Sequence, residues 1–485
     1  MKNLYSLKSI LLIVFYLLGL NTGFGQSKAE QIEKLMTFSH ETGQFNGSLV
    51  VAEHGKVIYK KGFGLANMEW DIPNQANTKF RLGSITKQFT AVLVMQLVEQ
   101  GKIKLDAPIV TYLPGYPPQA GEKVTIHHLL SQSSGIKDYT NLPGFRNGGS
   151  QNALSPEALI KLFADQPLEF EPGEKFAYSN SNYVLLGKII ERVTGSSYAQ
   201  YVQDNIFTPL KMQNSGYDNS SIIVKSQARG YEQNGDGYVN ASYVNMNNTY
   251  AAGALYSTVE DLFLWDQALY SPQLLSAKSL NLLFANQMAI NKNSYYGYGW
   301  YVGEVSNLTK NRLRIAQHSG NLPGFVTRIC RMPSDKNLIV LLNNTTNAPL
   351  REISDAISAI LYDKPFTMPR ISLAKTIFEI MAKQGLAMGV EKIKQLKNSE
   401  AYIIQEVDMN EGAYQLLQAG KMQEALEMLK LNAETFPSSG NVYDSLGEAY
   451  LKTGNKELAI INYKKAVELD SKNDNAKKML NELTR

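Results

Sequence analysis

Two β-rich blocks lie at opposite ends of a long segment with helical patterning, and this arrangement most constrains the fold. The first block, at 47–67, alternates β-branched residues around His54-Gly55 and predicts a hairpin. The second covers 294–346. We expect strands from both blocks to form one antiparallel sheet with helices on its faces, an α+β fold that closes with a helix over 349–361.

Length and composition agree with a folded, multidomain chain. The 485 residues suffice for roughly two to four domains. Apolar residues make up 44% and charged residues 19%, which excludes a disordered chain. The formal net charge is only +4 and no run of like charges occurs, so we expect no nucleic-acid partner.

The segment 1–25 is typical of a cleaved secretory signal. Two lysines precede an apolar stretch at 10–20, and small residues follow up to Gly25. The stretch is too short to span a bilayer, which takes about 20 residues. Cys330 is the single cysteine, so no intrachain disulfide can form. We therefore expect a periplasmic or secreted bacterial protein with no membrane span after signal cleavage.

A 34-residue period distinguishes the end of the chain. AGKMQEALEMLKLNAETFP aligns with TGNKELAIINYKKAVELDS one period later. A helix–turn–helix period of this length is the signature of tetratricopeptide repeats, so we expect an all-α unit at 406–485 with repeats at about 410–437 and 441–474. Such stacks usually need about three repeats, so helices in the linker 364–405 are expected to cap them.

The sharpest candidate for chemistry is Ser84-Ile85-Thr86-Lys87, which opens the apolar segment QFTAVLVMQLVEQG. A serine and a lysine three positions apart share a helix face, so the amine can reach the hydroxyl. Burial would lower the lysine pKa toward the neutral amine that activates a nucleophile. The same spacing recurs at Ser134/Lys137 and Ser372/Lys375, but only Ser84 begins a long apolar helix. The alternative is an N-cap serine with a solvated lysine.

A second candidate is Tyr178-Ser179-Asn180, which follows a Pro-Gly turn and precedes a helix expected to end at Gly195. A tyrosine near a lysine can act as a general base, and the pair would titrate as a coupled unit. The alternative is a buried tyrosine that satisfies a backbone carbonyl.

The third candidate is His318-Ser319-Gly320, the one HxG of the chain, at the end of a predicted strand. A glycine there lets a substrate backbone lie against the strand edge, and the main-chain N–H just beyond can donate to an oxyanion. The alternative is a structural histidine.

In order and context, these three motifs resemble the serine β-lactamase and penicillin-binding-protein superfamily. The similarity is to its class C-like branch of D-alanyl-D-alanine carboxypeptidases, esterases and β-lactamase-related proteins. TIHHLLSQSSGI and AAGALYSTVEDLFLW look like recurring segments of that branch. The resemblance covers about 27–363 and implies a β-lactamase/transpeptidase-like antiparallel sheet flanked by helices.

The resemblance also implies roles for the motif residues. Ser84 would be the acylated nucleophile, and Lys87 and Tyr178 would together shuttle its proton. Asn180 would position the substrate amide. The backbone N–H groups of Ser84 and Asn321 would form the oxyanion hole, with His318 and Gly320 beside the substrate. Whether Lys87 or Tyr178 is the base stays open.

One departure bears on the substrate. β-Lactamases of this branch usually carry KTG where this chain has His318-Ser319-Gly320, and a largely neutral histidine attracts a substrate carboxylate less than a lysine does. This favours peptidase or esterase activity over β-lactam hydrolysis. The literal Lys452-Thr453-Gly454 falls in the predicted turn of the last repeat, where it has no such role.

The sequence therefore predicts a serine hydrolase that cleaves D-amino-acid peptides, amides or small esters without a cofactor. No histidine or cysteine spacing typical of a metal site occurs. The alternative is a non-catalytic binding protein, with a hydrolase-like domain that holds a ligand. In either case the repeats could bind a protein partner or only cover the domain's own surface.

Overall fold

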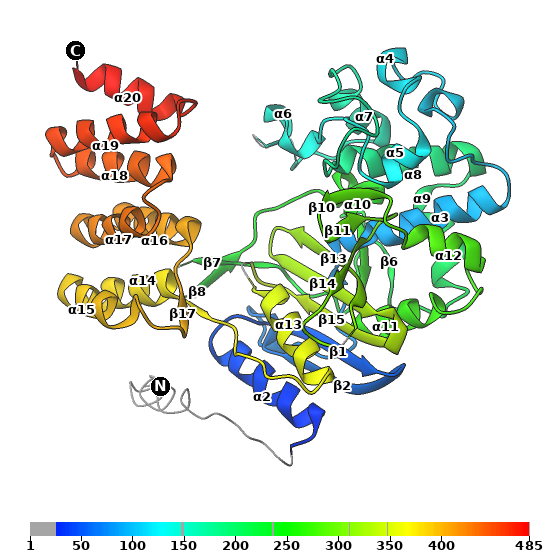
Figure 1. Cartoon of the computed structure of the whole chain (residues 1–485), viewed down its shortest axis with the longest axis horizontal. Helices are drawn as coiled ribbons and strands as arrows, with labels where there is room; N and C mark the ends of the chain where they lie inside the picture. Colours follow the sequence, from blue (N-terminus) through cyan, green and yellow to red (C-terminus); the bar gives the residue numbers. More distant parts are fainter. Residues whose placement is uncertain (1–25, 147–149, 235–236, 310, 347, 485) are drawn as a thin grey trace. The chain divides into compact units, whose positions relative to one another are not determined.

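The computed structural model describes residues 26–146, 150–234, 237–309, 311–346 and 348–484 (Figure 1). The larger of two compact units spans Gln26–Glu232 and Val239–Thr367, and the smaller contains Met368–Arg485. The predicted signal peptide, 1–25, lies outside the described residues. Among the described residues, no helix is both long enough and apolar enough to cross a membrane.

The larger unit is built on one antiparallel sheet of eight strands. The strands are β1 (Gly47–Glu53), β2 (Lys56–Phe63), β10 (Met288–Asn291), β11 (Ser294–Tyr296), β12 (Tyr301–Val305), β13 (Leu313–Leu322), β14 (Phe325–Met332) and β15 (Asn337–Asn343). Their order across the sheet is β10-β11-β12-β13-β14-β15-β1-β2. Val50 of β1 lies opposite Val340 of β15, so the first and last strands pair, and the predicted sheet is confirmed.

Local sequence accounts for the first hairpin. His54 and Gly55, between β1 and β2, have φ angles of 51° and 76°. Two positive φ angles make the turn that matches the twist of adjoining antiparallel strands. β1 is buried from Gly47 to Ala52, so both of its faces are covered.

Helices supply that cover (Figure 1). α2 (Lys28–Glu41) and α13 (Leu350–Leu361) pack against each other, α2 on β2 and α13 on β14 and β15. α11 (Val259–Ala268) packs on β1 and β15. The flanking helices expected from the sequence are therefore present.

Three further helices meet beside the sheet: α3 (Thr86–Glu99), α8 (Asn180–Thr194) and α10 (Tyr250–Gly253). α3 is buried along almost its whole length, in agreement with its apolar sequence. α8 ends at Gly195, whose φ of 74° gives the left-handed cap that glycine favours.

The smaller unit is a series of helices. They are α14 (Leu373–Gln384), α15 (Leu386–Leu396), α16 (Glu406–Gln418), α17 (Met422–Thr435), α18 (Gly440–Lys452), α19 (Lys456–Leu469) and α20 (Asp474–Thr484). α16/α17 and α18/α19 form the two helical hairpins of the 34-residue period. α14 and α15 pack against α16 and α17. Gly454, with φ of 81°, lies in the turn between α18 and α19, so Lys452-Thr453-Gly454 belongs to a repeat turn.

A buried ion pair joins α11 to the sheet. Arg331 Nε of β14 donates to Asp266 Oδ1 of α11 at 2.5 Å, and the two side chains are only 1% and 0% exposed. The Arg331 guanidinium also lies over the rings of Tyr270 and Trp300. Loss of either charged partner would leave the other buried without its counterion.

We expect Arg331→Met to lower the free energy of unfolding by about 3–5 kcal/mol, because Asp266 would stay buried and unpaired. Urea unfolding followed by tryptophan fluorescence measures this in the larger unit, which contains all three tryptophans. Arg351→Met is the matched control, because Arg351 and Asp355 form an exposed pair at 3.8 Å. Its effect should stay within about 0.5 kcal/mol, and equal losses in the two variants would contradict the argument.

Candidate active site

Ser84 lies in a tight turn between a short strand and a buried helix. β5 (Phe80–Arg81) leads into the 3₁₀ turn η1 (Gly83–Ile85), and α3 follows directly. Gly83 has a φ of 54°, and a Cβ there would lie 3.0 Å from the Asn321 amide nitrogen and 3.2 Å from Gly320 Cα. Glycine therefore allows the turn that carries Ser84 to approach β13 closely.

Lys87 extends from the first turn of α3 toward Ser84. Its Nζ lies 2.9 Å from Ser84 Oγ, 2.8 Å from Asn180 Oδ1 and 2.9 Å from the Ala252 carbonyl oxygen. The side chain is fully buried, and burial lowers the pKa of Lys87 to about 7, although the Asp138 charge opposes this. A substantial fraction of the amine is therefore neutral near pH 7.

The neutral amine fits these three contacts. It has two N–H donors and one lone pair, and the carbonyl oxygens of Asn180 and Ala252 can only accept. These two oxygens take the two N–H groups, so the lone pair remains for the Ser84 hydroxyl. Lys87 is thus placed to receive the Ser84 proton as a general base.

Asn180 is the first residue of α8, and both the oxygen and the nitrogen of its side-chain amide are hydrogen-bonded. Oδ1 accepts from Lys87 Nζ, and Nδ2 donates to Asp138 Oδ2 at 3.0 Å. Gln132 anchors the same helix end, because its Oε1 accepts from the Ser179 N–H at 3.0 Å and from Asn182 Nδ2 at 2.6 Å. The Tyr178-Ser179-Asn180 segment therefore has a fixed backbone beside Lys87.

The Tyr178 ring lies against the amine, with Lys87 Nζ 4.9 Å from the ring centroid. Its buried hydroxyl makes no hydrogen bond of standard geometry with the described residues. Burial raises the pKa of Tyr178 well above its ordinary value, and the nearby Ser84 hydroxyl offsets only part of that rise. Tyr178 therefore keeps its proton at neutral pH and is suited to donate it.

His318 is a buried, neutral histidine beside the Tyr178 ring. Its imidazole is 2% exposed, and burial together with the charge on Lys87 lowers its pKa to about 3. Nδ1 lies 2.7 Å from the Ser319 carbonyl oxygen and must carry the hydrogen, because that oxygen can only accept. Nε2 then accepts from the Tyr296 hydroxyl at 3.1 Å. Both ring nitrogens are thus occupied within the protein.

Gly320 and Asn321 provide the strand edge opposite Ser84. A Cβ on Gly320 would lie 1.9 Å from the Leu82 carbonyl oxygen, so only glycine fits this contact. β12 pairs with β13 no further than Gln317, which leaves this edge of β13 uncovered by β12. Leu322 and Phe325 close the tight hairpin to β14, so the alternating ladder directs the Asn321 N–H away from β14. The Ser84 and Asn321 amides can therefore converge on one oxyanion.

Sequence reasoning did not identify two residues that contact this site. Asp138 lies in a loop 42 residues before Asn180, and no spacing rule connects the two. Tyr296 belongs to β11, and only its place in the aromatic run YYGYGW hinted at a buried cluster. The residues that the sequence did predict all lie around the Lys87 amine or the η1 turn: Ser84, Lys87, Tyr178, Asn180, His318, Gly320 and Asn321.

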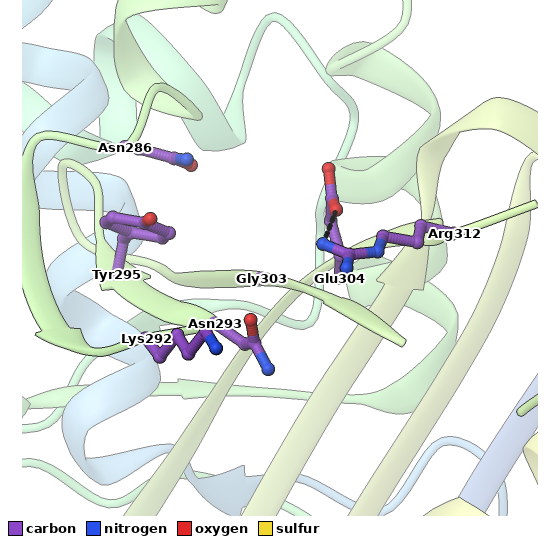
Figure 2. Close-up of a pocket in the computed structure, with 7 residues that line it drawn as sticks. All are labelled: Asn286, Lys292, Asn293, Tyr295, Gly303, Glu304 and Arg312. Atoms are coloured by element: carbon purple, nitrogen blue, oxygen red, sulfur yellow. Dashed lines mark ion pairs between the residues drawn. The ribbon is translucent and has the colours of Figure 1, made fainter. Parts of the chain in front are cut away.

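A small polar pocket of about 130 Å³ lies elsewhere on the sheet, at β11 and β12. Figure 2 shows Arg312 paired with Glu304 there, and Lys292 and Asn286 also line the pocket. None of the predicted site residues lines it. Over the residues that the structure describes, no group of three or more His, Cys, Asp or Glu side chains could hold a metal ion.

Comparisons with known proteins point to the same chemistry. The β-lactamase family profile matches residues 31–363, and a tetratricopeptide repeat profile matches residues 440–473. A penicillin-binding protein of Bacillus subtilis is 32% identical over 361 residues, 71% of this chain and 78% of that protein.

Solved structures resemble the larger unit. The octameric penicillin-binding protein homologue from Pyrococcus abyssi superposes with a TM-score of 0.62 at 30% identity, covering 72% of this chain and 81% of that one. A D-stereospecific amidohydrolase from Streptomyces sp. superposes with a TM-score of 0.55 at 25% identity, covering 65% of this chain and 98% of that one.

We expect the reactivity of Ser84 to rise with pH through about 7, because only the neutral Lys87 amine can accept the serine proton. The rate of fluorophosphonate labelling, followed by intact mass, measures this. Lys87→Met should label about 10²–10⁴ times more slowly and show no step near pH 7. A step near pH 7 that persists in this variant would exclude Lys87 as its source.

The close approach at Gly83 gives a second prediction. Gly83→Ala should slow labelling about 10²–10³-fold, because the new Cβ would push the η1 turn away from the Asn321 amide. Gly115→Ala is the control, since a Cβ at Gly115 meets no atom within 4 Å. Equal rates in the two variants would contradict this account of the turn.

Proposed function

This chain belongs to the β-lactamase family and is a serine hydrolase, and we propose that it hydrolyses D-amino-acid peptide, amide or ester bonds through an acyl intermediate on Ser84. The observation that carries the proposal is the Lys87 amine, buried and 2.9 Å from Ser84 Oγ, with its other two contacts made to acceptors.

In the first half-reaction Ser84 Oγ attacks the substrate carbonyl carbon while its proton passes to Lys87 Nζ. The backbone N–H groups of Ser84 and Asn321 donate to the oxyanion that forms. As the tetrahedral intermediate collapses, the bond to the leaving nitrogen or oxygen breaks. Tyr178 donates a proton to that atom and regains one from Lys87, which is neutral again.

In the second half-reaction water takes the place of the leaving group. It attacks the acyl carbon, gives one proton to the same Lys87/Tyr178 pair, and releases the carboxylic acid as Ser84 Oγ takes that proton back. Lys87 is the base of this scheme because its pKa lies near 7, whereas the pKa of Tyr178 is raised. The buried Tyr178 hydroxyl remains a proton donor throughout.

Three observations support D-amino-acid substrates or small esters. The relatives named above include a penicillin-binding protein and a D-stereospecific amidohydrolase. His318 stands where β-lactamases carry a lysine, and its neutral ring has no free nitrogen for a substrate carboxylate. The edge of β13 that β12 leaves unpaired can receive an extended acyl chain. By the family resemblance, Asn180 would lie near the scissile amide.

We place this reaction in the periplasm or outside the cell, on the strength of the signal-like segment 1–25. The repeats at the end of the chain give it a surface suited to a protein partner. A ligand-binding protein without turnover is the second candidate, and the following experiment separates it from an enzyme.

We expect purified protein to gain one adduct mass with a fluorophosphonate and, separately, with a penicillin, and Ser84→Ala to gain neither. Intact mass spectrometry measures both. Ser372→Ala is the matched control, because Ser372 has the same spacing to a lysine but donates to Asp408 in the smaller unit. An adduct retained in Ser84→Ala would place the nucleophile elsewhere. A Ser84 adduct combined with no turnover of any ester or amide would favour the binding protein.

A further inference from the structure

We propose that Asp138 is a positioning residue, which fixes the Asn180 amide with its oxygen toward Lys87 and places a negative charge beside the amine. The inference rests on the proposed function, because Lys87 is the base of that mechanism. Asp138 belongs to none of the three sequence motifs. It lies in the loop after Gly135, just before the 3₁₀ turn η3 (Tyr139–Asn141).

Both oxygens of Asp138 are committed. Oδ1 accepts from the Thr140 N–H at 3.0 Å, and Oδ2 accepts from Asn180 Nδ2 at 3.0 Å. Ser181 fastens the loop to α8, because its hydroxyl donates to the Lys137 carbonyl at 2.7 Å and accepts from the Tyr139 N–H at 3.0 Å. Hydrogen bonds from its own loop and from α8 therefore fix the position of the Asp138 carboxylate.

The chemistry of the contacts permits one orientation of the Asn180 amide. In the observed orientation its oxygen accepts from the Lys87 amine and its nitrogen donates to a carboxylate. If the amide turned over, acceptor would face acceptor at Asp138, and the amide N–H would either oppose an N–H of Lys87 or occupy the lone pair that Ser84 needs. A buried polar network penalises such mismatches strongly. Asp138 thus ensures that Asn180 takes an N–H of Lys87, which leaves the lone pair for Ser84.

Asp138 also supplies charge. Besides Asn180, the side chains that face the amine are the Tyr178 and Tyr183 rings, with centroids 4.9 and 5.6 Å from Nζ, the Ser84 hydroxyl and the His318 imidazole. Burial holds both tyrosines protonated and His318 neutral. Burial lowers the pKa of Lys87 to about 7, and the negative charge of Asp138 opposes that fall. Asp138 therefore favours the protonated amine and keeps the pKa of Lys87 from falling as far as burial alone would lower it.

Asp138→Asn tests both parts, because it keeps the size of the side chain, removes the charge and leaves one acceptor oxygen for the two N–H groups of Thr140 and Asn180. We expect a lower plateau of kcat with little change in KM, and an acid limb of kcat/KM displaced to lower pH. If the proton affinity of Lys87 falls tenfold, the ratio of kcat/KM at pH 6 to that at pH 8 rises about five-fold. Asp165→Asn, at an exposed aspartate, is the matched control and should leave the profile unchanged.

A direct titration makes the result independent of turnover. The ¹³Cε resonance of Lys87, assigned by its loss in Lys87→Arg, should titrate at lower pH in Asp138→Asn than in the unaltered protein. An unchanged midpoint would overturn the charge role. If the unaltered protein hydrolysed no substrate, the proposed function would fail, whereas this titration would still decide the role of Asp138.

A pair of substrates excludes the simplest rival explanation, in which Asp138 binds a substrate ammonium group. D-Alanine p-nitroanilide carries that ammonium group, whereas its N-acetyl derivative replaces it with a neutral amide. Positioning of the base predicts the same change in kcat for both substrates. An effect of Asp138→Asn confined to the KM of the free amine would overturn the proposal and make Asp138 a substrate contact.

Discussion

The burial of one lysine organises the larger unit. A lysine amine removed from water is stable only if it loses its proton or finds partners for its hydrogens, and Lys87 does both. Its partners come from segments far apart in the sequence: Ser84 in η1, Asn180 at the start of α8 and Ala252 in α10. The packing of α3, α8 and α10 therefore determines the surroundings of the Lys87 amine. A shift of any one of these helices would change the pKa of Lys87.

The backbone of α10 adopts an unusual conformation to place the Ala252 carbonyl beside Lys87. Tyr250, the first residue of α10, has a φ of 39°, a conformation that is unfavourable for a bulky residue. The neighbouring helix provides space for it, because a Cβ on Gly187 of α8 would lie 2.6 Å from the Tyr250 ring. The same short helix directs the Ala252 carbonyl to Lys87. Gly187 and the unfavourable φ of Tyr250 thus both help to place the Ala252 carbonyl oxygen within hydrogen-bond distance of the buried Lys87 amine.

Local patterns predicted much of this molecule, and long-range contacts account for what they missed. The turn at His54-Gly55, the end of α8 at Gly195 and the Ser84-Lys87 spacing each depend on a few adjacent residues, so the sequence contains them. The pKa of Lys87 depends on helices contributed by distant segments, and no local pattern indicates Asp138 across 42 residues of chain. For the same reason, the hydrogen bond to His318 Nε2 could not be foreseen, since Tyr296 reaches that ring only after β11, β12 and β13 have assembled.

The protonation states of the site explain why its backbone is built so closely around Ser84. Tyr178 and His318 are held neutral by burial, and Lys87 becomes neutral near pH 7, so none of the three offers a fixed cation to the substrate carbonyl. The negative charge that forms on attack must then be stabilised by backbone N–H groups. That need accounts for two glycines: Gly83 brings η1 within reach of the Asn321 amide, and Gly320 brings β13 against the Leu82 carbonyl. Because Lys87 and Tyr178 supply no fixed positive charge, the site depends on the close contact between η1 and β13 that brings two backbone N–H groups together.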